Sequence, residues 1–217
     1  DNEQSYLTKI HMNLNAMGYN QPIWLDGAAA NASLFYIILK ILLLGEIKAV
    51  LELGSGETTR LINYFVNNTN YPSEAVTLED DVQWFERLRG EIYGVRHSYI
   101  LCNMIPVILN DSLEMSTYYD IEKHISGKKF GMVIVDGPLG DRRPISNYLP
   151  EIVDEKWIVV IDDYHKENKL YGKDVTDFCK KSFDAKGTPY SQSIVRAKKY
   201  QSILYSSNYS WLFNGLQ

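Results

Sequence analysis

Little in this sequence points to a fold held together by covalent or metal cross-links. The 217 residues include only two cysteines, Cys102 and Cys179, and neither belongs to a CxxC or zinc-type spacing. Isolated cysteines suit a reducing compartment, so we expect a cytoplasmic protein. A chain of this length buries roughly 70% of its unfolded surface, so it needs neither disulfides nor a structural metal in order to fold.

Long hydrophobic runs are also missing. The longest apolar run, Leu34 to Leu44, is interrupted by Lys40. It falls well short of the ~20 residues that a membrane-spanning helix requires. No signal-peptide pattern opens the sequence either. We therefore expect a buried helix at this run and no membrane partner.

Positive charge is too scarce and too scattered for a nucleic-acid surface. The chain has 22 Lys and Arg against 27 Asp and Glu, a net charge of −5. A phosphate backbone is bound by clustered Lys and Arg, and no such stripe occurs, so no nucleic-acid partner is expected. Internal repeats, low-complexity segments and clear linkers are absent too. We predict a single domain over residues 1–217, with a helical cover in residues 1–45 and an α/β core in residues 46–217.

What the sequence does contain is an alternation of short apolar runs with helical segments after Gly45. Short runs bounded by Gly, Asp and Asn are typical of buried parallel strands, and the intervals leave room for crossover helices. The predicted strands are 49–53, 75–78, 106–109, 132–135 and 158–161, followed by an antiparallel hairpin of 191–197 and 200–206. These elements predict a Rossmann-like, doubly wound α/β fold with a seven-stranded, mostly parallel sheet and an antiparallel C-terminal hairpin.

Four helices are expected between and before these strands. They span residues 2–17, 31–44, 58–67 and 81–93. In the last of them Trp84, Phe85, Leu88 and Ile92 recur at helical spacing, which predicts a core-facing stripe rather than a ligand site. The segment 21–30, with its Pro and Gly content, is predicted to be a lid over a ligand.

The segment 50–59 runs from a buried strand through a glycine turn into a helix. Backbone N–H groups at such a turn suit a ligand at the carboxyl end of the strand. A nicotinamide dinucleotide fingerprint would have glycine at the position of Thr59, and a phosphate loop would have Gly-Lys-Ser/Thr, which is absent. Glu52 stands near the end of the apolar strand, where burial of an acid is costly without a cationic or hydrogen-bonding partner.

This segment resembles the first motif of the class I S-adenosylmethionine-dependent methyltransferases, through Glu52-Leu53-Gly54-Ser55-Gly56. The resemblance extends to about Asp163 and implies S-adenosylmethionine as the cofactor. It implies that Glu79, after the second strand, holds the ribose hydroxyls, and that Asp111 and Ser112, after the third, contact adenine. The cofactor-binding residues implied by the resemblance are Glu52, Gly54, Ser55, Gly56, Thr59, Glu79, Asp80, Asp111, Ser112 and Asp136.

Acids also follow the fourth and fifth predicted strands, as Asp136 and as the pair Asp162 and Asp163. Carboxylate oxygens suit a hard divalent cation such as Mg²⁺. The pattern resembles the metal-dependent O-methyltransferases of the catechol, caffeoyl-CoA and macrocin types, which implies these three aspartates as metal ligands. In other methyltransferases with a similar pattern the carboxylates cap turns or contact the substrate without a metal. Both interpretations remain open at this point.

The catalytic base is less clearly marked. The lysine that follows the first aspartate in the catechol type is absent here. His165 lies two residues beyond the acidic pair, and an imidazole is a common general base, so His165 is our candidate base, with Asp136 as a second catalytic residue. Arg142 and Arg143 either clamp an anionic group of the acceptor or are solvated surface charges.

The predicted function is O-methylation of a small-molecule hydroxyl, in a sugar or a secondary metabolite, with or without a divalent ion. Tyrosine is abundant, at 16 residues, and Tyr171 is one of several in predicted loops that suit a pocket for a ring. The alternatives are a metal-independent methyltransferase of the same fold and a non-catalytic module that binds S-adenosylmethionine or a nucleotide. Thr59 and the lack of a Tyr-x-x-x-Lys pair disfavour a nicotinamide oxidoreductase. A homo-oligomer is compatible with each of these.

Overall fold

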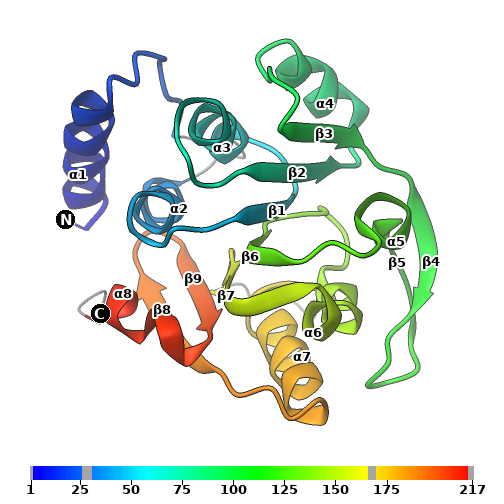
Figure 1. The fold of residues 1–217 in the computed structure, drawn as a ribbon. Coiled ribbons are helices and arrows are strands. Elements are labelled where there is room, and N and C mark those ends of the chain that lie inside the picture. Colours follow the sequence, from blue (N-terminus) through cyan, green and yellow to red (C-terminus); the bar gives the residue numbers. More distant parts are fainter. Residues whose placement is uncertain (1, 26–30, 166–169, 215–217) are drawn as a thin grey trace.

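The computed structural model describes residues 2–25, 31–165 and 170–214. Its centre is the predicted seven-stranded sheet, in the order β3-β2-β1-β6-β7-β9-β8 (Figure 1). The strands are β1 (Ala49–Leu53), β2 (Glu74–Glu79), β3 (His97–Leu101), β6 (Phe130–Val135), β7 (Val153–Ile161), β8 (Ser191–Arg196) and β9 (Tyr200–Tyr205). The first five are parallel, whereas β9 is antiparallel to both β7 and β8. The predicted fold class and hairpin are confirmed.

Helices cover both faces of the sheet (Figure 1). They are α1 (Asn2–Met17), α2 (Ala32–Leu44), α3 (Glu57–Asn68), α4 (Val82–Arg89), α5 (Ile121–Ile125), α6 (Leu149–Ile152), α7 (Gly172–Ala185) and α8 (Ser210–Phe213), with 3-10 turns η1 (Arg143–Asn147) and η2 (Ser207–Tyr209). One apolar cluster packs α1, α2 and α3 on one face, and a second packs α5, α6 and α7 on the other.

Helix α2 shows how the local sequence sets these elements. It begins where the side chain of Asn31 accepts a hydrogen bond from the backbone N–H of Leu34, and it ends at Gly45. Its residues are apolar on nearly every side because α1 covers the side that faces away from the sheet. Among the described residues no helix is both long and apolar enough to cross a membrane.

The prediction that residues 106–109 form the third strand of the sheet is wrong. They belong mostly to β4 (Met104–Ile108), which pairs with β5 (Met115–Tyr119) in a separate antiparallel ribbon. The third parallel strand is β3, at the edge of the sheet. Because an edge strand is partly solvated, its sequence, His-Ser-Tyr-Ile-Leu, lacks the apolar run that marks a central strand. Pro106 lacks an N–H group, which suits a two-stranded ribbon better than the middle of a sheet.

Two local predictions also need correction. The helix predicted over 81–93 ends at Gly90, and of its apolar stripe only Leu88 is buried, while Trp84 lines a cavity instead of the core. Within the predicted lid 21–30, residues 26–30 lie outside the described residues. The described part is held by Arg60, which donates to the backbone oxygen of Pro22 at 2.9 Å.

Candidate functional site

A cavity of about 610 Å³ opens at the carboxyl ends of β1, β2, β6 and β7. Seven residues predicted from the sequence line it: Gly54, Ser55, Glu79, Asp80, Asp136, Asp162 and Asp163. Further lining residues include Trp84, Tyr119, Arg142, Tyr171 and Lys199. Parallel strands place the loops that follow them along one edge, which explains why residues so distant in sequence meet here.

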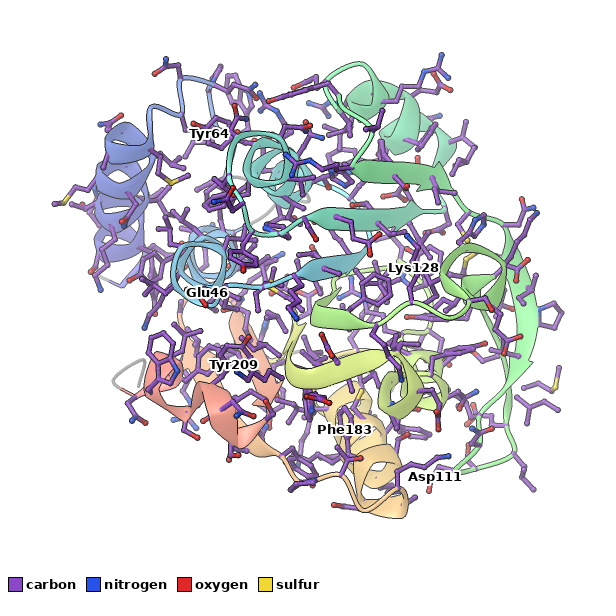
Figure 2. The ribbon with its side chains drawn as sticks, in the orientation of Figure 1. Glu46, Tyr64, Asp111, Lys128, Phe183 and Tyr209 are labelled. Atoms are coloured by element: carbon purple, nitrogen blue, oxygen red, sulfur yellow. The ribbon has the colours of Figure 1, made fainter. Side chains whose placement is uncertain are left out.

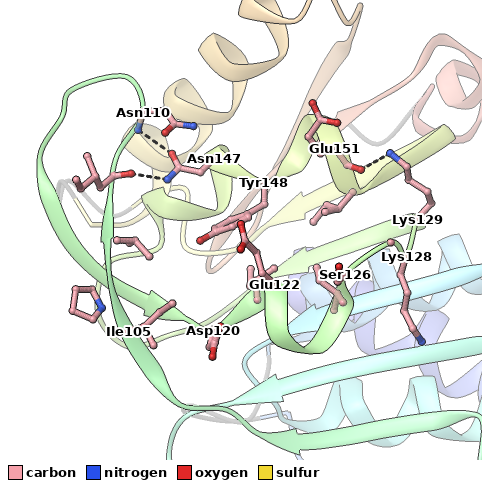
Figure 3. Close-up of a pocket in the computed structure, with 17 residues that line it drawn as sticks. Ile105, Asn110, Asp120, Glu122, Ser126, Lys128, Lys129, Asn147, Tyr148 and Glu151 are labelled. Carbon is pink, nitrogen blue, oxygen red and sulfur yellow. Dashed lines mark hydrogen bonds between the residues drawn. The ribbon is translucent and has the colours of Figure 1, made fainter.

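A second cavity, of about 530 Å³, lies between the β4–β5 ribbon and the short helices α5 and α6 (Figure 3). Several of its polar groups bind backbone atoms. The Asn147 side chain bridges the oxygen of Ile108 and the N–H of Asn110, and the Lys129 ammonium donates to the oxygen of Glu151. Because these groups hold the ribbon and helices together, we take the cavity at the strand ends as the candidate site.

Two glycines form the floor of the candidate site. Gly54 has a φ of +86°, a conformation that favours glycine. A Cβ on Gly137 would lie 2.7 Å from the Cα of Gly54, and a Cβ on Gly54 would lie 2.8 Å from the nitrogen of Gly137. Only two residues without side chains let the loops after β1 and β6 approach this closely. The predicted glycine turn is thus a point of backbone contact as well as a possible binding surface.

Glu79 is held at the cavity by the residues around it. Its carboxylate accepts hydrogen bonds from the backbone N–H of Ser55 at 2.9 Å, the Ser55 hydroxyl at 2.7 Å and the backbone N–H of Asp81 at 2.8 Å. The indole N–H of Trp84 donates to the backbone oxygen of Ser55. The carboxylate therefore acts as an acceptor of hydroxyl and N–H donors at the mouth of the turn.

Glu52 lies behind the turn and does not line the cavity. It is fully buried, and its carboxylate accepts hydrogen bonds from the hydroxyls of Thr58, Thr59 and Thr77 at 2.5 to 2.8 Å. The Thr59 hydroxyl also accepts the N–H of Gly56. Burial raises the pKa of Glu52 to about 7, although the three hydroxyls oppose the shift. The partners that this acid needs are thus threonine hydroxyls rather than a cationic ligand.

Three carboxylates converge on the part of the cavity wall that follows β6 and β7. Asp136, Asp162 and Asp163 each offer an oxygen, and these atoms lie within 4.8 Å of one another. Burial, and then the nearby charge of Asp162, raise the pKa of Asp136 well above its ordinary range. The acids predicted as a metal site from two separate strand ends are therefore close together in space.

Two cations face these acids. Arg142, only 3% exposed, places its guanidinium nitrogens 3.6 Å from a carboxylate oxygen of Asp136 and 3.4 Å from one of Asp163. The Lys199 ammonium lies 3.7 Å from the other oxygen of Asp163. Arg143 is also buried and binds two other carboxylates. The interpretation of the two arginines as solvated surface charges is therefore wrong.

Three predicted site residues lie elsewhere. Asp111 and Ser112 occupy the exposed tip of the β4–β5 ribbon, where Asp111 pairs with Lys181 of α7 at 2.9 Å (Figure 2). Their assignment to adenine depended on the wrong third strand. His165 is exposed, accepts the N–H of Tyr200 at 3.2 Å and does not line the cavity. Its position gives the predicted role as a base no support.

Other residues of the site were not foreseen. Trp84 was assigned to the core because its helical spacing matches a packed face, and Tyr119 belongs to a strand that the sequence did not reveal. Tyr119 donates its hydroxyl proton to Asp80 at 3.0 Å. Lys199 enters from the turn between β8 and β9, and its place beside β7 follows only from the position of β9 in the sheet. The run of two lysines at that turn was the one signal available.

No protein-family model and no curated protein sequence matches this chain. Solved structures do. A structure described as a caffeoyl-CoA O-methyltransferase from Staphylococcus aureus superposes with a TM-score of 0.58 at 14% identity, covering 95% of this chain and 100% of its own. The O-methyltransferase from Bacillus cereus in complex with SAH gives 0.52 at 14% identity, over 93% and 89%. TomG from Streptomyces achromogenes, an O-methyltransferase in complex with SAM, gives 0.50 at 13% identity, over 92% and 87%. At these sequence identities the similarity establishes a shared fold. The resemblance to class I methyltransferases seen in the sequence is therefore confirmed for the fold.

Proposed function

We propose that this chain is an S-adenosylmethionine-dependent methyltransferase that acts on a hydroxyl of a small molecule, in a sugar or a secondary metabolite. The observation that carries the proposal is the cavity at the strand ends, which joins the glycine turn and Glu79 on one wall to three aspartates on the other. Two structures of similar fold are described as O-methyltransferases in complex with SAH or SAM, which supports S-adenosylmethionine as the cofactor.

The wall formed by Ser55, Glu79 and Trp84 would hold the cofactor. Glu79 already accepts two hydrogen bonds from Ser55, so vicinal ribose hydroxyls would take the place of the serine hydroxyl as donors. The indole of Trp84 offers a flat surface beside this acid for a purine ring. Gly54 lets a ligand approach the backbone. Asp80 is fixed by Tyr119 and adds negative charge that favours a sulfonium cation.

The acceptor would lie against the aspartates. S-adenosylmethionine supplies a methyl group on a sulfonium, and its transfer requires in-line placement of the acceptor oxygen. Asp136 borders the cavity and is our candidate to accept the proton of the acceptor hydroxyl and pass it to water. The new C–O bond forms as the C–S bond breaks, and the electron pair of that bond remains on sulfur. Tyr171 and Pro138 add the less polar part of the wall.

The role of the remaining predicted residues follows from their positions. Glu52, Gly56 and Thr59 stabilise the turn from behind, so we propose that they shape the cofactor site without touching the ligand. A non-catalytic module that binds S-adenosylmethionine would use the same cofactor wall of Ser55, Glu79 and Trp84. An assay of methyl transfer to a panel of hydroxyl acceptors separates this function from catalysis. The absence of nucleic-acid partners and the oligomeric state remain predictions.

The cofactor wall can be tested by calorimetry with S-adenosylhomocysteine. Replacing Glu79 with Gln removes the charged acceptor, and we expect affinity to fall by at least about tenfold because a charged hydrogen bond contributes ~1.5–3 kcal/mol. Glu74→Gln is the matched control, since Glu74 begins the same strand, has a half-buried side chain that pairs with Lys128 and does not line the cavity. Failure of the wild-type chain to bind, or equal affinities of wild type and Glu79→Gln, would refute the assignment.

A further inference from the structure

The aspartate cluster contains a cation of its own. The guanidinium of Arg142 lies between Asp136 and Asp163, at 3.6 Å and 3.4 Å from their oxygens, and is almost fully buried. A buried guanidinium without carboxylate partners would be strongly unfavourable. The same holds for three adjacent carboxylates without a cation when two of them, Asp162 and Asp163, are buried. Each side of this arrangement therefore satisfies the electrostatic need of the other.

The position of Arg142 does not depend on the carboxylates alone. Its Nε donates to the backbone oxygen of Pro138 at 3.0 Å, and its backbone N–H donates to the oxygen of Leu170 at 3.1 Å. The guanidinium carbon lies 4.6 Å from the ring centre of Tyr171. A planar guanidinium suits such stacking. These contacts fix the side chain at the cluster whether or not the aspartates are occupied by another ligand.

Asp162, the third acid of the cluster, also has hydrogen-bond donors of its own. One oxygen of Asp162 accepts a hydrogen bond from the Gln201 amide at 2.8 Å and a longer one from Asn31 at 3.4 Å. Lys199 adds a second cation beside Asp163. All three carboxylates thus face N–H donors or cations. A divalent ion prefers oxygen ligands that are free to surround it, and here it would lie within a few ångströms of a fixed guanidinium.

We propose that Arg142 is the resident cation of the Asp136–Asp162–Asp163 cluster, and that this cluster binds a guanidinium in place of a divalent metal ion. The donor set does not fit the ion that the resemblance to metal-dependent O-methyltransferases implies. The catalytic consequence rests on the proposed function: Arg142 acts as a positioning residue that holds the carboxylate of Asp136 toward the acceptor, and no metal takes part in methyl transfer.

The test is Mn²⁺ binding to the full chain, followed by electron paramagnetic resonance of the free ion and performed without cofactor or acceptor. The wild-type protein should bind no Mn²⁺ stoichiometrically at about 1 mM, the range of weak protein sites. Arg142→Met removes the charge while keeping an unbranched side chain. It should raise the affinity for Mn²⁺ at least about tenfold, because the guanidinium no longer repels the ion. Arg60→Met is the control, because it removes a guanidinium paired with Glu57 and Glu91 far along the chain from the cluster.

Each outcome decides the question. One-site Mn²⁺ binding by the wild type that is lost in Asp162→Asn would overturn the proposal, and so would a folded Arg142→Met variant that binds no better than the wild type. If Arg142→Met does not fold, the wild-type titration alone decides. Because no methyl transfer is measured, failure of this inference is distinct from failure of the proposed function. In an active preparation, turnover should also be unchanged by a chelator.

Discussion

Glu52 is a fully buried acid, so its surroundings differ strongly from water. It belongs to the central strand β1, and among the described residues its carboxylate accepts hydrogen bonds from three threonine hydroxyls. The chain of polar contacts continues from Thr77 to His97 at 2.8 Å. Burial lowers the pKa of His97 to about 4. The fold thus contains an acid that resists ionisation close to a base that resists protonation, and both add a pH dependence to stability.

The sign of the effect at Glu52 follows from its raised pKa. Between its ordinary value of 4.5 and about 7, the unfolded chain loses the Glu52 proton while the folded chain keeps it. The free energy of unfolding therefore falls as pH rises through this window, by about 3 kcal/mol at ~1.4 kcal/mol per pKa unit. His97 acts in the opposite sense over a similar window, because its folded pKa is lowered.

A substitution at Glu52 separates these two effects. Glu52→Gln keeps the His97 contribution and removes the ionisation of Glu52. We expect its stability relative to wild type to increase by up to about 3 kcal/mol between pH 5 and pH 8, measured by chemical denaturation at each pH. Glu155→Gln, at an exposed position of β7, should track the wild type at both pH values. A constant difference between Glu52→Gln and wild type would mean that Glu52 ionises normally in the fold.

At this scale the sequence identified acids better than it identified their partners. Asp136, Asp162 and Asp163 were predictable because each follows an apolar run, and strand ends of a parallel sheet share an edge. Arg142 was named but its burial was not predictable, since burial depends on loop packing against Tyr171. His165 was chosen for its chemistry and its short distance in sequence from the acids. The chain turns after Asp163, whose φ is +59°, so neighbours in sequence do not share the cavity.

At the scale of elements, the site depends on two loops that meet through their backbones. The loop after β1 passes Gly54 and the loop after β6 passes Gly137, and neither position has room for a methyl group. A Cβ at Gly137 would also lie 2.5 Å from the hydroxyl oxygen of Tyr119. The contact joins the proposed cofactor site around Ser55, the aspartates after β6 and β7, and the β4–β5 ribbon, so a change here affects all three.

Gly137→Ala should consequently be costly. We expect a loss of about 1–3 kcal/mol in the free energy of unfolding, as for overpacked sites, together with weaker binding of S-adenosylhomocysteine. Gly140→Ala is a matched control in the same loop, because a Cβ there meets no atom within 4 Å. Its effect should stay within about 0.5 kcal/mol. Denaturant titration and calorimetry of both variants measure the two quantities, and equal behaviour of the variants would contradict the role of this contact.

The sequence predicts a strand reliably only where the strand is buried on both faces, because its residues then form an apolar run. The central strands β1, β6 and β7 are buried on both faces and appear as apolar runs, so their positions were found. The edge strand β3 and the ribbon strand β5 expose part of their length and carry Ser, Thr and Tyr, so no run distinguishes them. One missed edge strand then displaced the third strand of the prediction and, with it, the residues assigned to adenine.

In the whole molecule, acids gather at the carboxyl edge of the sheet, and apolar residues pack on both of its faces. Six acids that follow or end strands line a single cavity: Glu79, Asp80, Asp81, Asp136, Asp162 and Asp163. The net charge of −5 is thus partly local to the proposed binding site of a cationic cofactor. The two apolar clusters lie on opposite sides of the sheet and share its strands, so we expect them to unfold together.

Conservative substitutions on the two faces test that expectation. Ile38 of α2 is fully buried in one cluster, and Ile121 of α5 is 1% exposed in the other. Each change to Val should lower the free energy of unfolding by ~0.5–1.5 kcal/mol, and the double variant should show the sum within about 0.5 kcal/mol because the sheet separates the sites. Fluorescence and circular dichroism should report one coincident transition for every variant. If the faces unfolded independently, Ile38→Val would shift one of two resolved transitions and leave the other in place, whereas a shared sheet predicts that either substitution moves the whole curve.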